Sequence, residues 1–177
     1  GALSYHFRAK SDFADYFLYV VRAATLQADA HSKRQYPECG AKRLLLYFML
    51  MGAWRATEPR YAAGMALFTD SASPSYEADA VIQDWLMISA DALETARDAG
   101  SSLSTLEAAE VFLVTNLGAA FFGRHVRAGA PGAQRLRFVR AALSAAGVSQ
   151  VDRHADEVLR EHQNRLPGLD YSSLEAG

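Results

Sequence analysis

Apolar residues recur along this chain at intervals of three to four positions, and no stretch of useful length alternates between polar and apolar residues. One such stripe runs through Phe13, Phe17, Val21 and Ala24. Residues at these spacings share one face of an α-helix, whereas a half-buried strand needs a period of two. The chain is therefore predicted to be all-α, a bundle of helices without a sheet.

Prolines, glycines and capping residues divide the chain into seven predicted helices. The first carries the stripe and ends before Pro37 and Gly40, and a break is expected over residues 69–75. The other helices are expected over residues 41–55, 59–68, 76–99, 104–126, 133–146 and 151–166. Gly100 is expected to stop its helix in a left-handed conformation, and Ser104 with Glu107 reads as a capping box.

The predicted helix over 104–126 is apolar on more than one face, because Val111, Phe112, Leu113 and Val114 are consecutive. A helix that is apolar all round must be buried all round. Its neighbour over 133–146 offers a second apolar stripe. Two interpretations stay open, an interface with a second copy of the chain or the centre of a monomeric core. The candidate interface residues are Val114, Phe121, Leu136, Val139 and Leu143.

The bulk composition is that of one globular domain with a real core, since 50% of the 177 residues are hydrophobic and 21% are charged. The densest apolar run, residues 44–53, is about half the ~20 residues that a membrane-spanning helix needs. No secretory leader pattern is present, and Cys39 is the single cysteine, which rules out an internal disulfide. The expected location is the cytoplasm, without a membrane partner.

Charge is distributed unevenly. Residues 1–60 carry nine Lys and Arg against five Asp and Glu, residues 61–123 carry one against nine, and residues 124–177 carry eight against six. The basic bias at the N-terminal end favours an approach to nucleic acid there, while the acidic middle repels phosphates. A run of charges can equally be a solvated face.

No catalytic or metal-binding motif is present. The sequence has no Gly-rich phosphate loop, His-Glu-x-x-His, Gly-x-Ser-x-Gly or Cys-x-x-Cys pattern. His154 and His162 can share a helix face, but acidic residues surround them, so a solvated face is expected instead of a metal site. The prediction is a protein without enzymatic activity, cofactor or metal. The other histidines are scattered: His6, His31 and His125.

The middle helices are rich in aromatic residues and methionine, which often line adaptable apolar pockets. Thr115 and Asn116 are candidates for the few polar contacts that such a pocket needs, with Gln83 as a further one. An ordinary hydrophobic core is the competing interpretation. The candidate apolar lining consists of Tyr47, Met51, Trp54, Tyr61, Met65, Phe68, Trp85 and Phe112.

The N-terminus reads Gly-Ala-Leu-Ser-Tyr-His-Phe, and Lys10 follows. On a helix that ends near His6, Leu3 and the Phe four positions later pack inward. Ser4, Tyr5 and His6 then point outward, where hydroxyl and imidazole donors, together with Lys10, suit contacts with a phosphate backbone.

This block resembles the end of the DNA-recognition helix in TetR-family transcriptional regulators, which typically reads Gly-x-Leu-Tyr-x-His-Phe. The chain departs from that pattern at Ser4, where Tyr is usual, and at Ala9, where a capping Ser or Thr is common. The resemblance implies three parts. Residues 1–9 end the recognition helix, residues 10–166 form a helical effector-binding and dimerisation domain, and residues 167–177 are a tail.

The resemblance further implies a TetR-like helical bundle that acts as a ligand-responsive regulator, in the first instance a repressor. The rest of the helix-turn-helix domain would precede residue 1. The helices at 104–126 and 133–146 would meet their symmetry mates, and the partners would be operator DNA, a small effector and a second copy. The alternatives are an all-α ligand-binding or adaptor domain without a DNA role, and a small helical enzyme.

A narrower similarity concerns the actinomycete γ-butyrolactone receptors. Trp85 stands before a helix end at residues 96–100 at the distance found for a pocket tryptophan in that subgroup. Residues 60–65 and the Leu117-Gly118 pair fit the same subgroup. This similarity implies a small, mostly apolar effector such as a γ-butyrolactone, stacked on Trp85.

Overall fold

The computed structural model describes residues 10–70, 76–122, 131–162 and 166–168. Over these ranges the chain is all-helical and contains no strand, which confirms the predicted class. The helices are α2 (Lys10–Gln35), α3 (Gly40–Thr57), α4 (Pro59–Asp70), α5 (Tyr76–Ala96), α6 (Thr105–Phe122), α7 (Pro131–Ala145) and α8 (Val151–His162). None of the helices in these ranges combines the length and the apolar character that crossing a membrane requires.

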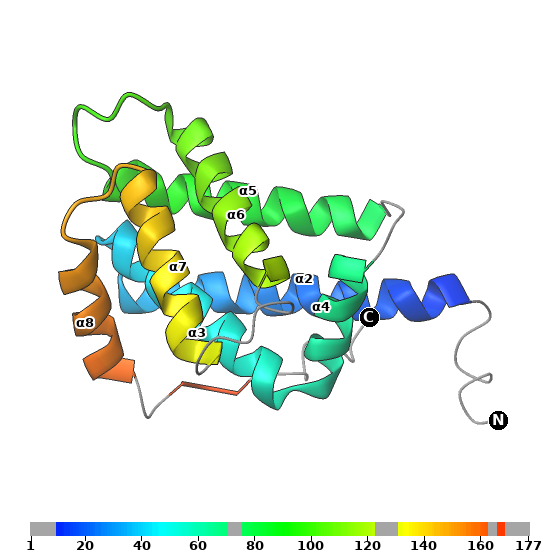
Figure 1. Cartoon of the computed structure of the whole chain (residues 1–177). Coiled ribbons are helices and arrows are strands. Elements are labelled where there is room, and N and C mark those ends of the chain that lie inside the picture. Colours follow the sequence, from blue (N-terminus) through cyan, green and yellow to red (C-terminus); the bar gives the residue numbers. More distant parts are fainter. Residues whose placement is uncertain (1–9, 71–75, 123–130, 163–165, 169–177) are drawn as a thin grey trace.

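Helix α3 is the centre of the bundle and packs against α2, α4, α5, α7 and α8. Helix α6 packs against α5 and α7. The long α2 passes along the bundle, and its first turns extend beyond the other helices at the end opposite α8 (Figure 1). This helix therefore connects the N-terminal end of the molecule with the end where α8 lies.

The second half of the predicted apolar stripe on α2 belongs to the core. Val21 and Ala24 are fully buried, and they pack with the apolar residues of α3. Helix α6, in contrast, is not buried on every side of the single chain. Val114 is 70% exposed and Leu106 is 50% exposed, because α5 and α7 cover only part of the α6 surface.

Two glycines allow close contacts between helices. At the start of α3, a Cβ on Gly40 would lie 1.7 Å from the carbonyl oxygen of Ala92 in α5. In α4, a Cβ on Gly64 would lie 2.4 Å from the carbonyl oxygen of Phe17 in α2. Both contacts meet main-chain atoms, which cannot move aside as a side chain can. The sequence at these positions therefore sets the spacing of α3 to α5 and of α4 to α2.

Helix α5 ends at Ala96, before the predicted boundary, and Gly100 is not left-handed. The reason is a tertiary contact with the connection between α7 and α8. The backbone N–H of Asp98 donates to the carbonyl of Gly147 at 3.1 Å, and Arg97 pairs with Val148 in an isolated bridge. The left-handed glycine is Gly147, with φ of 86°.

The capping box at the start of α6 is confirmed. The backbone N–H of Ser104 donates to the Glu107 carboxylate at 2.7 Å, and the N–H of Glu107 donates to the Ser104 hydroxyl at 3.2 Å. The predicted end of the last helix at residue 166 is wrong, because residues 166–168 are not helical, and the described part of α8 runs to His162. There the indole N–H of Trp54 donates to the Pro167 carbonyl at 2.8 Å, which holds this segment against α3.

The Arg97 side chain, after the end of α5, forms hydrogen bonds with the residues after α7 and with those at the start of α6. We expect its replacement to destabilise the fold. Its guanidinium donates to the carbonyls of Ala146 (3.1 Å) and Leu103, and to the Thr105 hydroxyl at 3.3 Å. Arg97→Met keeps the aliphatic stem but leaves both carbonyls without this donor. The free energy of unfolding should fall by about 2 kcal/mol in urea titrations. Arg137→Met, at an exposed site on α7, is the control and should change it by less than about 0.5 kcal/mol.

Candidate functional site

The structure brings most of the predicted effector-binding residues into one buried region between α2, α3, α4 and α5. Trp85 is 6% exposed, and the Phe68 ring meets it edge-on with the ring centroids 5.0 Å apart. Phe112 comes from α6, and its ring contacts the ring of Phe48 of α3 edge-on. The buried members of the predicted set are Tyr47, Met51, Trp54, Tyr61, Met65, Trp85 and Phe112, and Phe68 is half-buried.

A polar pair lies inside this apolar region. The indole N–H of Trp85 donates to the hydroxyl of Thr25 at 2.8 Å, and both side chains are buried. Thr25 is not among the residues predicted from the sequence. It follows Val21 by four residues and so continues the buried stripe of α2, where a hydroxyl is out of place among apolar neighbours. That mismatch was the available indication.

The Tyr47 hydroxyl is a second polar group in this region. It is buried and has no hydrogen-bond partner among the residues that the structure describes. Burial raises the pKa of Tyr47 well above its ordinary value, and Tyr61 adds to the shift. The Thr25 hydroxyl opposes it through a weak contact that does not have the geometry of a hydrogen bond. A buried hydroxyl without a partner costs about 1–3 kcal/mol relative to one that is satisfied. This position therefore favours a ligand with a polar atom that Tyr47 can reach.

The polar residues predicted for the pocket contact their own helix. The hydroxyl of Thr115 donates to the Val111 carbonyl at 2.8 Å, and the Asn116 amide donates to the Phe112 carbonyl at 2.8 Å. Gln83 is exposed on α5. The polar groups inside the aromatic region include instead the hydroxyls of Thr25, Tyr47 and Tyr61, and the Tyr61 hydroxyl donates to Sδ of Met51 at 3.3 Å.

The predicted interface residues fall into different environments. Val114 is exposed, and Leu136 is half-buried and packs against the core. Val139 and Leu143 are 1% and 0% exposed within the single chain. Because these two side chains already lie inside the core, they have no free area to offer a second copy, and the interface assignment does not suit them.

Several predicted residues lie outside what the structure describes. Ser4, Tyr5 and His6 precede the described residues. Lys10 is the first residue of α2 and Phe121 belongs to α6, but their side chains are not described. The DNA-contact assignment and the Phe121 assignment therefore stay predictions.

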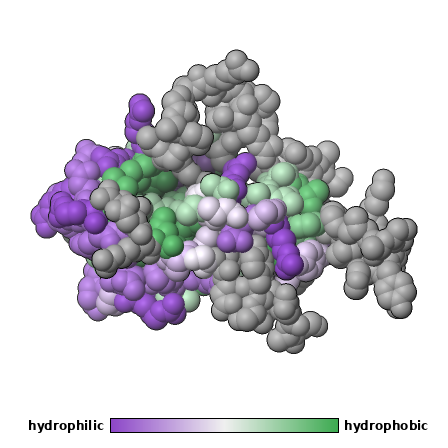
Figure 2. Space-filling model, turned by 90° about the horizontal axis from the view of Figure 1, so that it is seen from below, coloured by the Kyte–Doolittle hydropathy of each residue, from purple (hydrophilic) through white to green (hydrophobic). Residues whose placement is uncertain are grey.

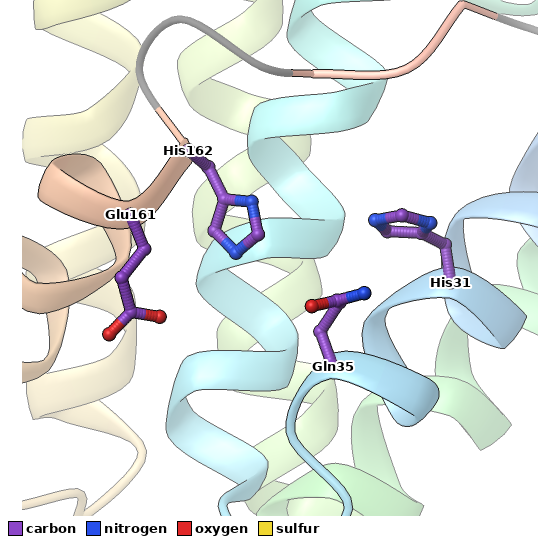
Figure 3. Close-up of a pocket in the computed structure, with 4 residues that line it drawn as sticks. All are labelled: His31, Gln35, Glu161 and His162. Carbon is purple, nitrogen blue, oxygen red and sulfur yellow. The ribbon is translucent and has the colours of Figure 1, made fainter.

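A separate polar pocket of about 340 Å³ lies between the last turns of α2 and the end of α8, lined by His31, Gln35, Glu161 and His162 (Figure 3). The two imidazoles face each other across it, and Gln35 comes from the same helix as His31. Hydrophilic residues gather at this end of the molecule on the face seen in Figure 2. The acidic residues around His162 in the sequence favour a solvated face, and no local pattern links His162 to His31.

Tyr36 contacts both α8 residues that line this pocket. Its hydroxyl donates to the Glu161 carboxylate at 2.5 Å and lies 3.0 Å from Nε2 of His162. The Tyr36 ring meets the His162 ring edge-on, and the Lys42 ammonium lies 5.4 Å from the centre of the Tyr36 ring. Burial and the Glu161 carboxylate raise the pKa of Tyr36, so its hydroxyl stays protonated.

The charges around the pocket are largely paired. Lys42 contacts Glu157 at 2.7 Å and Arg153 contacts it at 3.0 Å, and these hydrogen bonds lower the pKa of Glu157 to about 2. Burial lowers the pKa of His31, and the positive charges of Arg34 and His162 lower it further. The surroundings of His31 therefore disfavour an additional positive charge.

No group of three His, Cys, Asp or Glu side chains suited to hold a metal ion occurs in the described ranges. Comparisons with protein-family models, with curated proteins and with solved structures found no match.

Proposed function

We propose that the chain is the effector-binding and dimerisation part of a TetR-like transcriptional regulator, a repressor that a small, mostly apolar effector releases from DNA. The observation that carries the effector site is the Thr25–Trp85 pair with the unpartnered Tyr47 hydroxyl inside an otherwise apolar region. The DNA-binding role rests on the N-terminal block and on the basic bias of residues 1–60.

The composition of the region supports an effector with an apolar body and a small polar head. Burial of apolar surface contributes about 25 cal/mol per Å², which favours an alkyl group among the aromatic rings and methionines. Two hydroxyls can satisfy one or two polar atoms. A γ-butyrolactone with an alkyl side chain has this composition, with its ring carbonyl as an acceptor for Tyr47.

The packing of α4 on α2 supplies a route from this region to the N-terminal end. Tyr61 and Met65, two of the buried residues, belong to α4, and Gly64 of the same helix lies against the main chain of Phe17. An effector that displaces α4 would therefore displace the first half of α2. For release from DNA it must bind the displaced state better than the DNA-competent state.

The proposed dimer joins α6 and α7 to their copies. The exposed Val114 supports this part of the proposal, because an apolar side chain that is 70% exposed gains burial when a second copy covers it. Such a dimer would hold two recognition helices about 34 Å apart, at successive major grooves.

The test of the DNA-binding role uses the full-length protein. Genomic fragments that it retains are selected, and their release by γ-decalactone and related alkyl lactones is followed by mobility shift. Lys10→Ala should weaken binding about equally for selected and random DNA, and lower the slope of log affinity against log salt by about one. Retention of no fragment above random DNA would contradict the regulator and favour a ligand-binding or adaptor domain.

Tyr47→Phe separates effector binding from stability. The change removes the unpartnered hydroxyl without changing the ring, so the free energy of unfolding should stay constant or rise by about 1 kcal/mol. The same change should weaken binding of the lactone by about tenfold, because its carbonyl loses a donor. Calorimetric titration and urea unfolding give the two values.

The matched control is Tyr19→Phe, at an exposed position of α2, which should alter neither quantity. A Tyr47→Phe protein that binds the lactone as tightly as the unaltered chain would remove Tyr47 from the effector site.

A further inference from the structure

We propose that the pocket between α2 and α8 binds a small oxyanion, a carboxylate or a phosphate, held between His31 and His162 with Gln35 as a neutral donor. This site is separate from the aromatic region, and the inference does not depend on the proposed regulator role. Its lining comes from helix ends that are far apart in the sequence, and its two imidazoles face each other (Figure 3).

Two side chains of the lining have unused hydrogen-bonding capacity. The His31 ring and the Gln35 side-chain amide have no hydrogen-bond partner among the described residues. The two side chains are one turn apart on α2. The Gln35 amide offers two N–H donors and the His31 ring offers one or two, according to its charge. An oxyanion accepts hydrogen bonds from all of them at once.

The contact with Tyr36 determines the tautomer of His162. The Tyr36 hydroxyl uses its single hydrogen to donate a hydrogen bond to the Glu161 carboxylate. Its oxygen therefore accepts a hydrogen bond from the N–H at Nε2 of His162. The other ring nitrogen, Nδ1, then carries a proton only when the ring is charged. In Figure 3 this nitrogen is on the side of the ring that faces His31. The His162 ring therefore becomes a second donor into the pocket when it is protonated.

The charges around the pocket favour an anion between the two rings. Glu161 is the one acidic residue of the lining, and its carboxylate is engaged by Tyr36 and lies on the far side of His162 from His31 in Figure 3. The Lys42 ammonium pairs with Glu157 at 2.7 Å, and the negative charge of Glu161 also raises the pKa of Lys42. On the α2 side, burial and the positive charge of Arg34 lower the pKa of His31. Two imidazolium rings in this arrangement repel each other unless an anion separates them.

Binding should therefore be coupled to proton uptake. An anion stabilises the charged imidazoles, so it raises the pKa of His31, which burial and the nearby positive charges lower in the free protein. By linkage the anion binds more tightly as the pH falls through the range in which the His31 ring takes up a proton. For one linked proton we expect about tenfold tighter binding at about pH 5.5 than at about pH 7.5.

The experiment is an NMR titration of the histidine ring protons in the full chain. Malonate and inorganic phosphate are the two anionic probes, and malonamide is the uncharged counterpart of malonate. Both or either of the anions should shift the rings of His31 and His162 in a saturable way and raise the apparent pKa of His31. The tighter of the two anions then identifies the class of ligand, and malonamide should have no such effect.

Two variants test the lining. Gln35→Glu keeps the size of the side chain but adds a negative charge, and it should weaken malonate binding by about tenfold or more. His31→Gln keeps a neutral donor but removes the titrating ring, so the remaining affinity should lose most of its dependence on pH. His154→Gln is the matched control, because His154 is on α8 but does not line the pocket.

Three results would overturn the proposal. Histidine shifts that increase linearly with salt and do not saturate would indicate screening alone. Equal effects of malonamide and malonate would exclude recognition of charge. An equal loss of affinity in His154→Gln and in Gln35→Glu would place the anion elsewhere on α8. The variants are compared only after their circular dichroism spectra match that of the unaltered chain.

Discussion

Gly40→Ala is expected to destabilise the chain more than any other single methyl group added within the described helices α3 to α8. The new Cβ would lie 1.7 Å from the carbonyl oxygen of Ala92, far below any contact that real Cβ atoms make. It would also lie 2.8 Å from the hydroxyl of Thr95. Because Ala92 belongs to the rigid main chain of α5, the first turn of α3 would have to move away as a unit.

This movement affects the neighbouring contacts of α3. Arg43, one turn further on, is 7% exposed and donates to Asp91 of α5 at 2.6 Å, and it lies 3.7 Å from Asp29 of α2. A displaced α3 would break these ion pairs while the Arg43 side chain stays largely buried. We expect the free energy of unfolding to fall by about 3 kcal/mol or more, measured by urea unfolding followed by circular dichroism.

Gly100→Ala is the matched control for this prediction. Gly100 has open space around its Cα and is not left-handed, so a methyl group meets no neighbour and no backbone strain. The free energy of unfolding should change by less than about 0.5 kcal/mol. Similar losses in the two variants would mean that α3 does not approach α5 as closely as the structure has it.

The contrast between these two glycines shows what the sequence could predict. Helical periodicity, proline positions and the Ser104–Glu107 capping box depend on neighbouring residues, so they predicted the order and most starts of the helices that the structure describes. The end of α5 depends on a contact between Asp98 and Gly147, which are remote in the sequence. A glycine stop signal at Gly100 was therefore a reasonable expectation that a tertiary hydrogen bond overrode.

The two candidate sites differ in the same way. The aromatic and methionine residues that gather around Trp85 could be predicted, because apolar content identifies buried positions. Their polar partner Thr25 could not, since a single threonine on a buried stripe has many possible explanations. The pocket of His31 and His162 depends on the ends of α2 and α8 lying side by side, and no local pattern encodes that neighbourhood.

The interface assignment shows a limit of apolar patterns. A stripe of apolar residues on a helix indicates burial but does not say whether the same chain or a second copy covers it. For Val139 and Leu143 the same chain does. An aspartate at either position would unfold the protomer, and a loss of dimer would then carry no information. Val114, which is 70% exposed, is the position that separates assembly from folding.

Val114→Asp is accordingly expected to convert the proposed dimer into a folded monomer. The aspartate is solvated in the single chain, so the free energy of unfolding of the protomer should change by less than about 0.5 kcal/mol. In a dimer whose interface covers this side chain, the change would bury one carboxylate from each copy, which should raise the dissociation constant by about a hundredfold or more. Sedimentation velocity over a range of concentrations measures this constant. Leu26→Asp, at a 49% exposed position of α2, should leave it unchanged. A Val114→Asp protein that sediments as the unaltered dimer would remove α6 from the interface, because no dimer that covers this side chain can absorb two uncompensated carboxylates.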